Sequence, residues 1–143
     1  MDNAFKYIEK TPLETESEYP YTARNGKCKS SGSGSGKVAS FYDVTPNSVA
    51  QLKAAIQKGP TSVAIEADQF SFQSYTSGVI TKGCGQQLDH GVLAVGYGTE
   101  NNIDYFLVKN SWGASWGDQG YVKIAASASN VCGILSDASQ PTD

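Results

Sequence analysis

Residues 89–98 read DHGVLAVGYG and place the only histidine of the chain at the start of an apolar run. The run from Gly91 to Tyr97 predicts a β-strand, so His90 is expected at a strand end, half exposed, with a glycine beside it that lets other groups approach. A neutral imidazole is the usual proton acceptor for a serine or cysteine nucleophile, which makes His90 a candidate general base. A purely structural histidine at the end of a strand is the alternative interpretation.

A second stretch, residues 110–121, reads NSWGASWGDQGY. The side-chain carbonyl of Asn110 could accept the ring N–H of a catalytic histidine without adding a charge. Trp112 and Trp116 could shield such a bond from water, which would strengthen it. Alternatively, the two tryptophans are core aromatics in a glycine-rich turn.

The order of the remaining segments predicts an α+β class, with the strands concentrated toward the C-terminus. Ser48 and Gln51 form a capping-box pattern that predicts a helix over 48–58, with a buried stripe followed by a Gly-Pro stop. Further strands are expected at 61–66, 105–109 and 121–125, separated by turn residues.

The N-terminal 36 residues predict one short helix and a long loop. Asp2 is expected to cap the helix, and Thr11-Pro12 to end it. Residues 13–36 have turn signals and an alternating Ser/Gly run at 31–36, which is expected to be a flexible surface loop, with an engineered linker as the alternative. The carboxylates of Glu14, Glu16 and Glu18 are expected to be simply solvated.

Composition excludes several classes of protein. The chain has 143 residues, 39% of them apolar and 17% charged, with 15 glycines and a net charge of −3. These values favour one domain rich in strands and turns over a helical bundle, and they give no basic footprint for nucleic acid. Because the sequence has neither a long apolar run nor an apolar stretch after a basic start, we expect no membrane span and no signal peptide within it.

Taken together, the two motifs resemble one family closely. The segments 89–98 and 109–121, with the Tyr-Pro-Tyr at 19–21, Gly59-Pro60 and Cys132-Gly133-Ile134, follow the order of a papain-like cysteine peptidase of the cathepsin L type. The resemblance covers nearly the whole chain. It implies the antiparallel, β-barrel-like right-hand domain of the papain-like fold over residues 13–143. Residues 1–12 would be the remainder of a helix from the left-hand domain.

The resemblance also implies roles for individual residues. His90 would be the general base, and Asn110 would orient it. Residues implied in substrate binding are Met1, Ala64, Leu88, Asp89, Trp112 and Asp137, of which Trp112 would border the leaving-group side of the cleft. An acid at position 137, on the floor of the pocket for the residue two before the scissile bond, is expected to make arginine or lysine acceptable there.

The nucleophilic thiolate of that family has no counterpart in this sequence. The family's nucleophile lies roughly 130–150 residues before the histidine, whereas only 89 residues precede His90. No cysteine here lies in a Cys-Gly-Ser-Cys-Trp setting, and the oxyanion-hole glutamine is missing too. Because Met1 matches an internal methionine of the family, we expect the chain to begin inside a longer protein, whose first half would carry the cysteine.

By resemblance, Cys84 pairs with Cys132, and Cys28 is left without its partner. A zinc site made of the three cysteines and His90 is weakly supported, because no Cys-x-x-Cys spacing is present; no metal and no cofactor is expected. The implied compartments are lysosomal or vacuolar, or extracellular, where disulfides persist.

Two functions remain open at this point. The first is a cysteine-type endopeptidase with a Cys-His-Asn triad, of which this chain is a part that is inactive alone and acts on peptide or protein substrates. The second is a non-catalytic pseudo-peptidase or binding module.

Overall fold

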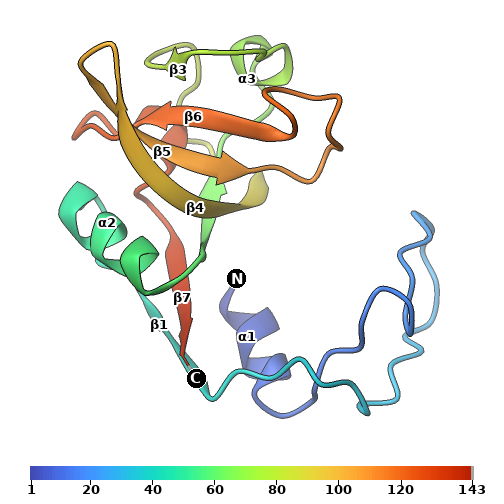
Figure 1. Ribbon diagram of the computed structural model, residues 1–143. Helices are drawn as coiled ribbons and strands as arrows, with labels where there is room; N and C mark the ends of the chain where they lie inside the picture. The colour runs from blue at the N-terminus through green and yellow to red at the C-terminus, as the bar shows by residue number, and fades with distance from the viewer. Residues whose placement is uncertain (143) are drawn as a thin grey trace. The chain divides into compact units, whose positions relative to one another are not determined.

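The computed structural model describes residues 1–142 and contains few helices and many strands (Figure 1). In chain order the elements are α1 (Asp2–Ile8), β1 (Ser40–Asp43), α2 (Val49–Lys58), β2 (Thr61–Ile65), α3 (Phe70–Gln73), β3 (Val79–Ile80), β4 (His90–Glu100), β5 (Ile103–Lys109), β6 (Tyr121–Ala125), the 3-10 turn η1 (Val131–Gly133) and β7 (Ala138–Thr142). No helix within the described residues is both long and apolar enough to cross a membrane.

The chain divides into two compact units. Unit 1 contains residues 1–42 with Pro141 and Thr142, and unit 2 contains Asp43–Gln140. The boundary between them falls within β1 and β7. The division expected from the resemblance, at residues 12 and 13, stays a prediction.

The strands form one sheet in the order β1-β7-β2-β4-β5-β6-β3. The pairs β2–β4, β4–β5 and β5–β6 are antiparallel, whereas the short β3 runs parallel to β6. The α+β class is therefore as expected. The sheet is open, however, and does not close into a barrel, because β1 and β3 each have a neighbour on one side only.

The core of unit 2 comes from alternate residues of the central strands. In β5 and β6, Phe106, Val108, Val122 and Ile124 are fully buried while the residues between them are more exposed. This alternation follows from the two-residue period of a strand. It is consistent with the register of β5 and β6, which places Lys109, the residue before Asn110, opposite Tyr121.

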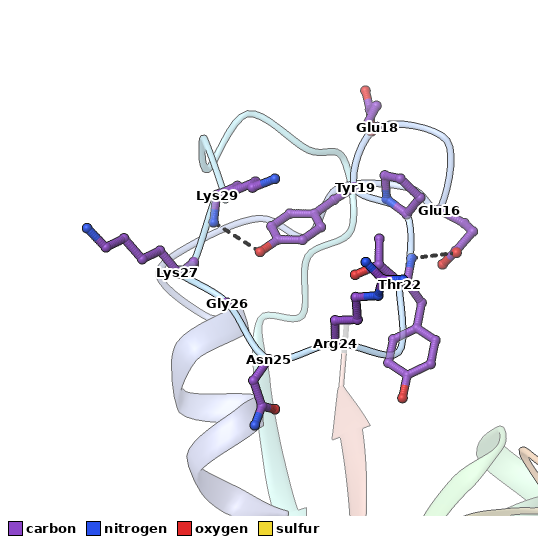
Figure 2. Close-up of a pocket in the computed structure, with 12 residues that line it drawn as sticks. Glu16, Glu18, Tyr19, Thr22, Arg24, Asn25, Gly26, Lys27 and Lys29 are labelled. Atoms are coloured by element: carbon purple, nitrogen blue, oxygen red, sulfur yellow. Dashed lines mark hydrogen bonds between the residues drawn. The ribbon is translucent and has the colours of Figure 1, made fainter.

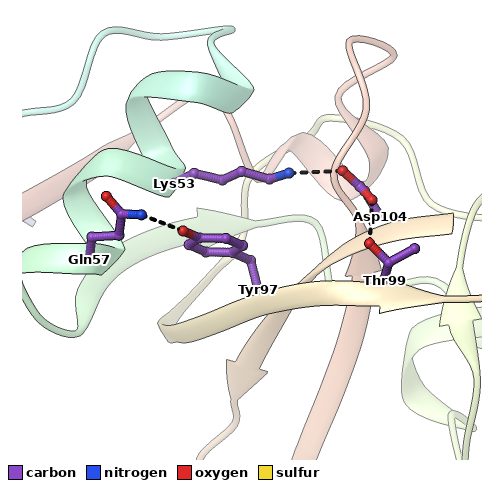
Figure 3. Close-up of polar contacts among 5 residues, drawn as sticks. All are labelled: Lys53, Gln57, Tyr97, Thr99 and Asp104. Atoms are coloured by element: carbon purple, nitrogen blue, oxygen red, sulfur yellow. Dashed lines mark hydrogen bonds and ion pairs between the residues drawn. The ribbon is translucent and has the colours of Figure 1, made fainter.

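Polar contacts connect helix α2 to the hairpin of β4 and β5 (Figure 3). Lys53 Nζ lies 2.8 Å from Asp104 Oδ2, and the amide of Gln57 donates to the hydroxyl of Tyr97. The hydrogen bond from Lys53 is the main cause of a lowered pKa of Asp104, with further help from Thr99. The Ser48 hydroxyl accepts from the Gln51 N–H, which confirms the expected cap of this helix.

Unit 1 begins with α1, whose start differs from the expectation. Met1 occupies the N-cap position, and Asp2 lies in the first turn, so the expected capping role of Asp2 is wrong. The negative charge still lies at the positive end of the helix dipole. Within the same unit, Phe5 stacks on Phe41 with the ring centroids 5.3 Å apart.

The acidic residues of the long loop are not simply solvated. Glu14 accepts hydrogen bonds from the side chains of Ser30 and Ser31 and from the N–H groups of Ser31 and Gly32. Glu16 accepts from the Tyr21 N–H, and Glu18 from Thr15. Glu14 thereby joins the two ends of a loop that folds around a pocket, shown in Figure 2 and formed by residues of 16–29.

We expect the Glu14 contacts to survive in acid. Desolvation raises the pKa of Glu14, but the hydrogen bonds from its own backbone, Ser30 and Ser31 outweigh this and lower it to about 2 from 4.5. Because the folded-state pKa is depressed, the stabilisation is fully present above pH 4.5 and is lost as the pH falls through about 2. A carbon-detected NMR titration should place the midpoint of Glu14 near 2.

The matched substitution is Glu14→Gln, which turns an amide NH₂ toward groups that donate. It should speed hydrogen exchange at Ser31 and Gly32, whereas Glu9→Gln, which removes the same charge outside the loop, should not. Equal exchange in both variants, or an ordinary glutamate midpoint, would contradict this account.

Candidate active site

The sheet brings the expected histidine and asparagine together. His90 is the first residue of β4 and Asn110 directly follows β5; the register Leu93↔Lys109 places these two strand ends side by side. His90 Nε2 lies 2.8 Å from Asn110 Oδ1. Asn110 is 7% exposed, so the bond lies largely out of water, where it is stronger.

The contacts of Asn110 determine the tautomer of the histidine. Asn110 Oδ1 also accepts the N–H of Ser111 at 2.8 Å, which identifies it as the carbonyl oxygen of the amide. An amide oxygen can only accept, so His90 Nε2 must be the donor in its bond. The lone pair of the neutral ring is then on Nδ1, which has no hydrogen-bond partner within residues 1–142.

Aromatic rings cover one side of this pair. Trp112 stacks on His90 with the ring centroids 5.1 Å apart and the planes at 28°. Trp112 in turn meets Phe72 and Trp116 edge to face, at 5.5 and 5.2 Å. Phe72 is fully buried, whereas Trp112 is 40% exposed. The three aromatic rings therefore extend from the core to the surface beside the imidazole.

Three of the residues expected to bind substrate lie around the start of β4. Ala64 pairs with Gly91, and its N–H donates to the carbonyl of Asp137. The exposed carboxylate of Asp89 accepts the N–H of Ala67 at 2.8 Å. Ala64, Asp89 and Asp137 are thus held near His90 by backbone contacts.

The other two expected residues are placed differently. Leu88 is 39% exposed and packs so closely on Gly133 that a Cβ at that glycine would meet Leu88 Cδ2 at 2.6 Å. Met1 belongs to unit 1, where its carbonyl accepts the N–H of Ala4 at 3.0 Å. The loop pocket of Figure 2 contains none of the expected catalytic or substrate-binding residues.

A disulfide joins Cys84 to Cys132, with their Cα atoms 4.9 Å apart. It ties the loop that leads to Leu88 and His90 to η1, whose strained backbone includes Cys132 at φ 56°. Cys28 is a free, exposed cysteine in unit 1. Two of the four side chains of the weakly supported zinc site are therefore bonded to each other.

Sequence reasoning missed two residues at this place. Phe72, on α3, supports Trp112, and an aromatic residue shortly after a strand gave no specific signal for that contact. Glu66 is 5% exposed and directly follows β2, yet its Oε2 has no hydrogen-bond partner among the described residues. Its burial depends on the close approach of Gly85, which no local pattern reveals.

In this arrangement an amide oxygen binds the imidazole of His90 and an indole ring covers it. Residues 1–142 match the family described as "Papain family cysteine protease". The chain belongs to this papain family of cysteine peptidases.

Individual relatives agree with this assignment. The chain is 48% identical to the Germination-specific cysteine protease 1 of Arabidopsis thaliana and 48% identical to the Digestive cysteine proteinase 3 of Homarus americanus, over 99% of its length in each case. It spans 39% and 46% of those two proteins, which is less than half of each.

Solved structures have the same fold. Bromelain from Ananas comosus superposes with a TM-score of 0.89 at 39% identity, and the match covers 99% of this chain and 68% of that one. Digestive procathepsin L 3 of Tenebrio molitor gives a TM-score of 0.91 at 40% identity, covering 100% of this chain and 48% of that one. The papain-like fold of the chain is thereby established.

Proposed function

We propose that this chain supplies the general base and its orienting amide to a cysteine-type endopeptidase, with the thiolate provided by a segment outside these 143 residues. The observation that carries the proposal is the bond from His90 Nε2 to Asn110 Oδ1 beneath Trp112, which leaves Nδ1 open as a proton acceptor. Family membership and the fold support it.

The chemistry follows from these positions. His90 Nδ1 takes the proton of the thiol, and the resulting thiolate attacks the carbonyl carbon of the scissile peptide bond. The imidazolium, stabilised by Asn110, then protonates the leaving amine as the C–N bond breaks, which leaves an acyl-thioester. His90 next accepts a proton from water, which hydrolyses the thioester and restores the thiol.

Unit 2 has no free thiol to offer, because its two cysteines form the disulfide. Cys28, the remaining cysteine, is exposed in the long loop and does not begin a helix. We therefore propose that the chain is inactive alone and needs a thiol-bearing partner segment. The disulfide also supports placement in a lysosomal, vacuolar or extracellular compartment.

The test compares this chain alone with the complete protein that contains it, using an internally quenched peptide. The chain alone should give no hydrolysis, and the complete protein should give cleavage that a thiol alkylator abolishes. Thiol-dependent cleavage by the chain alone would overturn the proposal. A complete protein that binds peptides without cleaving them would favour the pseudo-peptidase instead.

Substrate preference provides a further prediction. Asp137 is exposed and lies beside Ala64, so its carboxylate can meet a basic side chain two residues before the scissile bond. In the complete protein, Asp137→Ala should lower kcat/KM for arginine at that position and leave leucine nearly unchanged. Equal loss for the two substrates would contradict this role.

A further inference from the structure

One phenylalanine on α3 has a side chain that lies largely in solvent. Phe70 is 83% exposed, whereas Phe72, two residues further along the same helix, is fully buried. Residues two apart do not share a face of a helix, so Phe70 points away from the core that holds Phe72. No ring contact is made by Phe70 within the described residues, and single exposed aromatic residues are common, so exposure alone says little.

The helix α3, which carries Phe70, lies next to the candidate active site. On one side of the helix, Ala67 donates its N–H to Asp89, the residue before His90. At the other end, Trp116 Nε1 donates to the carbonyl of Gln73 at 3.0 Å. The helix that carries Phe70 is therefore anchored on both sides to residues of the candidate active site.

Two more contacts fix α3 in place. Phe72 packs against Trp112, the ring that covers His90, and the hydroxyl of Ser71 donates to the carbonyl of Gly83. Figure 1 shows α3 next to the segment between β5 and β6, which carries Trp112. Three residues span at most about 11 Å, so Phe70 Cα lies within that distance of Ala67 Cα.

Trp112 is expected to border the leaving-group side of the cleft, and α3 is held against it through Phe72. We therefore infer that Phe70 is a specificity-determining residue, which binds an aliphatic or aromatic side chain of the substrate on the leaving-group side of the scissile bond. A substrate in extended conformation advances about 3.4 Å per residue, so its second and third residues past the scissile bond lie about 7 to 10 Å beyond that bond. The phenyl ring offers apolar contact there but no charge. The inference rests on the proposed peptidase function.

The experiment uses the complete protein and three substrates with one common acyl part. The first ends in a fluorogenic amide, the second continues with leucine two residues past the scissile bond, and the third has glutamate at that place. Phe70→Ser should lower kcat/KM for the leucine substrate roughly tenfold, and Phe70→Leu should largely retain it. The fluorogenic amide should be cleaved equally by all variants, which also shows that they fold.

The matched control is Ile103→Ser. Ile103 is 37% exposed and pairs with Glu100, about 30 Å along β4 from His90, so its loss should change none of the three rates. Equal effects of Phe70→Ser on the leucine and glutamate substrates, or no effect on either, would overturn the inference while the peptidase function stands. No cleavage of the fluorogenic amide by the parent protein would overturn both.

Discussion

His90→Ala should abolish peptide cleavage by the complete protein, with a loss in kcat of about 10⁴- to 10⁶-fold. Without the imidazole, the thiol has no neighbouring group to take its proton, and the leaving amine has no acid to protonate it. The measurement is single-turnover and steady-state hydrolysis of the fluorogenic amide, together with a circular dichroism spectrum to show that the fold persists.

The control for this prediction is Gln57→Ala, an exposed residue of α2 whose amide donates to the Tyr97 hydroxyl. It should leave kcat within about twofold, because surface changes away from the site are usually nearly neutral. A His90→Ala protein that retains more than about a hundredth of the parent rate would mean that another group serves as the base.

Removing the disulfide should produce a large loss of stability in this chain. The Cys84–Cys132 bond closes a loop with a sequence separation of 48 residues. In the chain-entropy model such a loop is worth about 4 kcal/mol. The double variant Cys84→Ala with Cys132→Ala should therefore lose about that much free energy of unfolding in a urea titration.

Cys28→Ala provides the matched control, because that thiol is exposed and unpaired with another cysteine. Its unfolding midpoint should equal that of the parent chain. Should the double variant fail to fold, titrating the parent chain with a reducing agent measures the same loss. A loss below about 1 kcal/mol on reduction, or an equal loss in Cys28→Ala, would contradict the assigned role.

Local patterns were sufficient for some elements of the fold. The capping pattern at Ser48 and Gln51 predicted α2, and the apolar runs predicted the cores of β4, β5 and β6. Their signals are strong because capping and hydrophobic alternation are local properties of the sequence. The resemblance that the two motifs carry predicted that His90 and Asn110 belong to one site.

Elements that depend on distant partners were not predictable. The strand β7 reads ASQPT, with polar residues and a proline, yet it pairs with β2 in the sheet. It is stabilised there by the bond from the buried Thr61 hydroxyl to Gln140 Oε1 at 2.5 Å, between residues far apart in the chain. The helix α3 was missed for a similar reason, since its four residues are fixed by the tryptophans and not by their own propensity.

The hydrogen bonds of Glu14 were likewise not predictable from the sequence. The three glutamates looked like a solvated charge cluster, because a sequence shows charge but not the donors that the fold places around it. Ser30 and Ser31 meet Glu14 only after the loop has closed.

Cys84 lies six positions before His90, so a bond that forms only under oxidising conditions holds the stretch that carries the candidate base. A loss of about 4 kcal/mol is a large part of the 5–15 kcal/mol that ordinarily keeps a domain folded. In a reducing compartment the reduced chain would therefore unfold more readily than the disulfide-bonded chain. The lifetime of this domain would thus depend on the redox state of its surroundings.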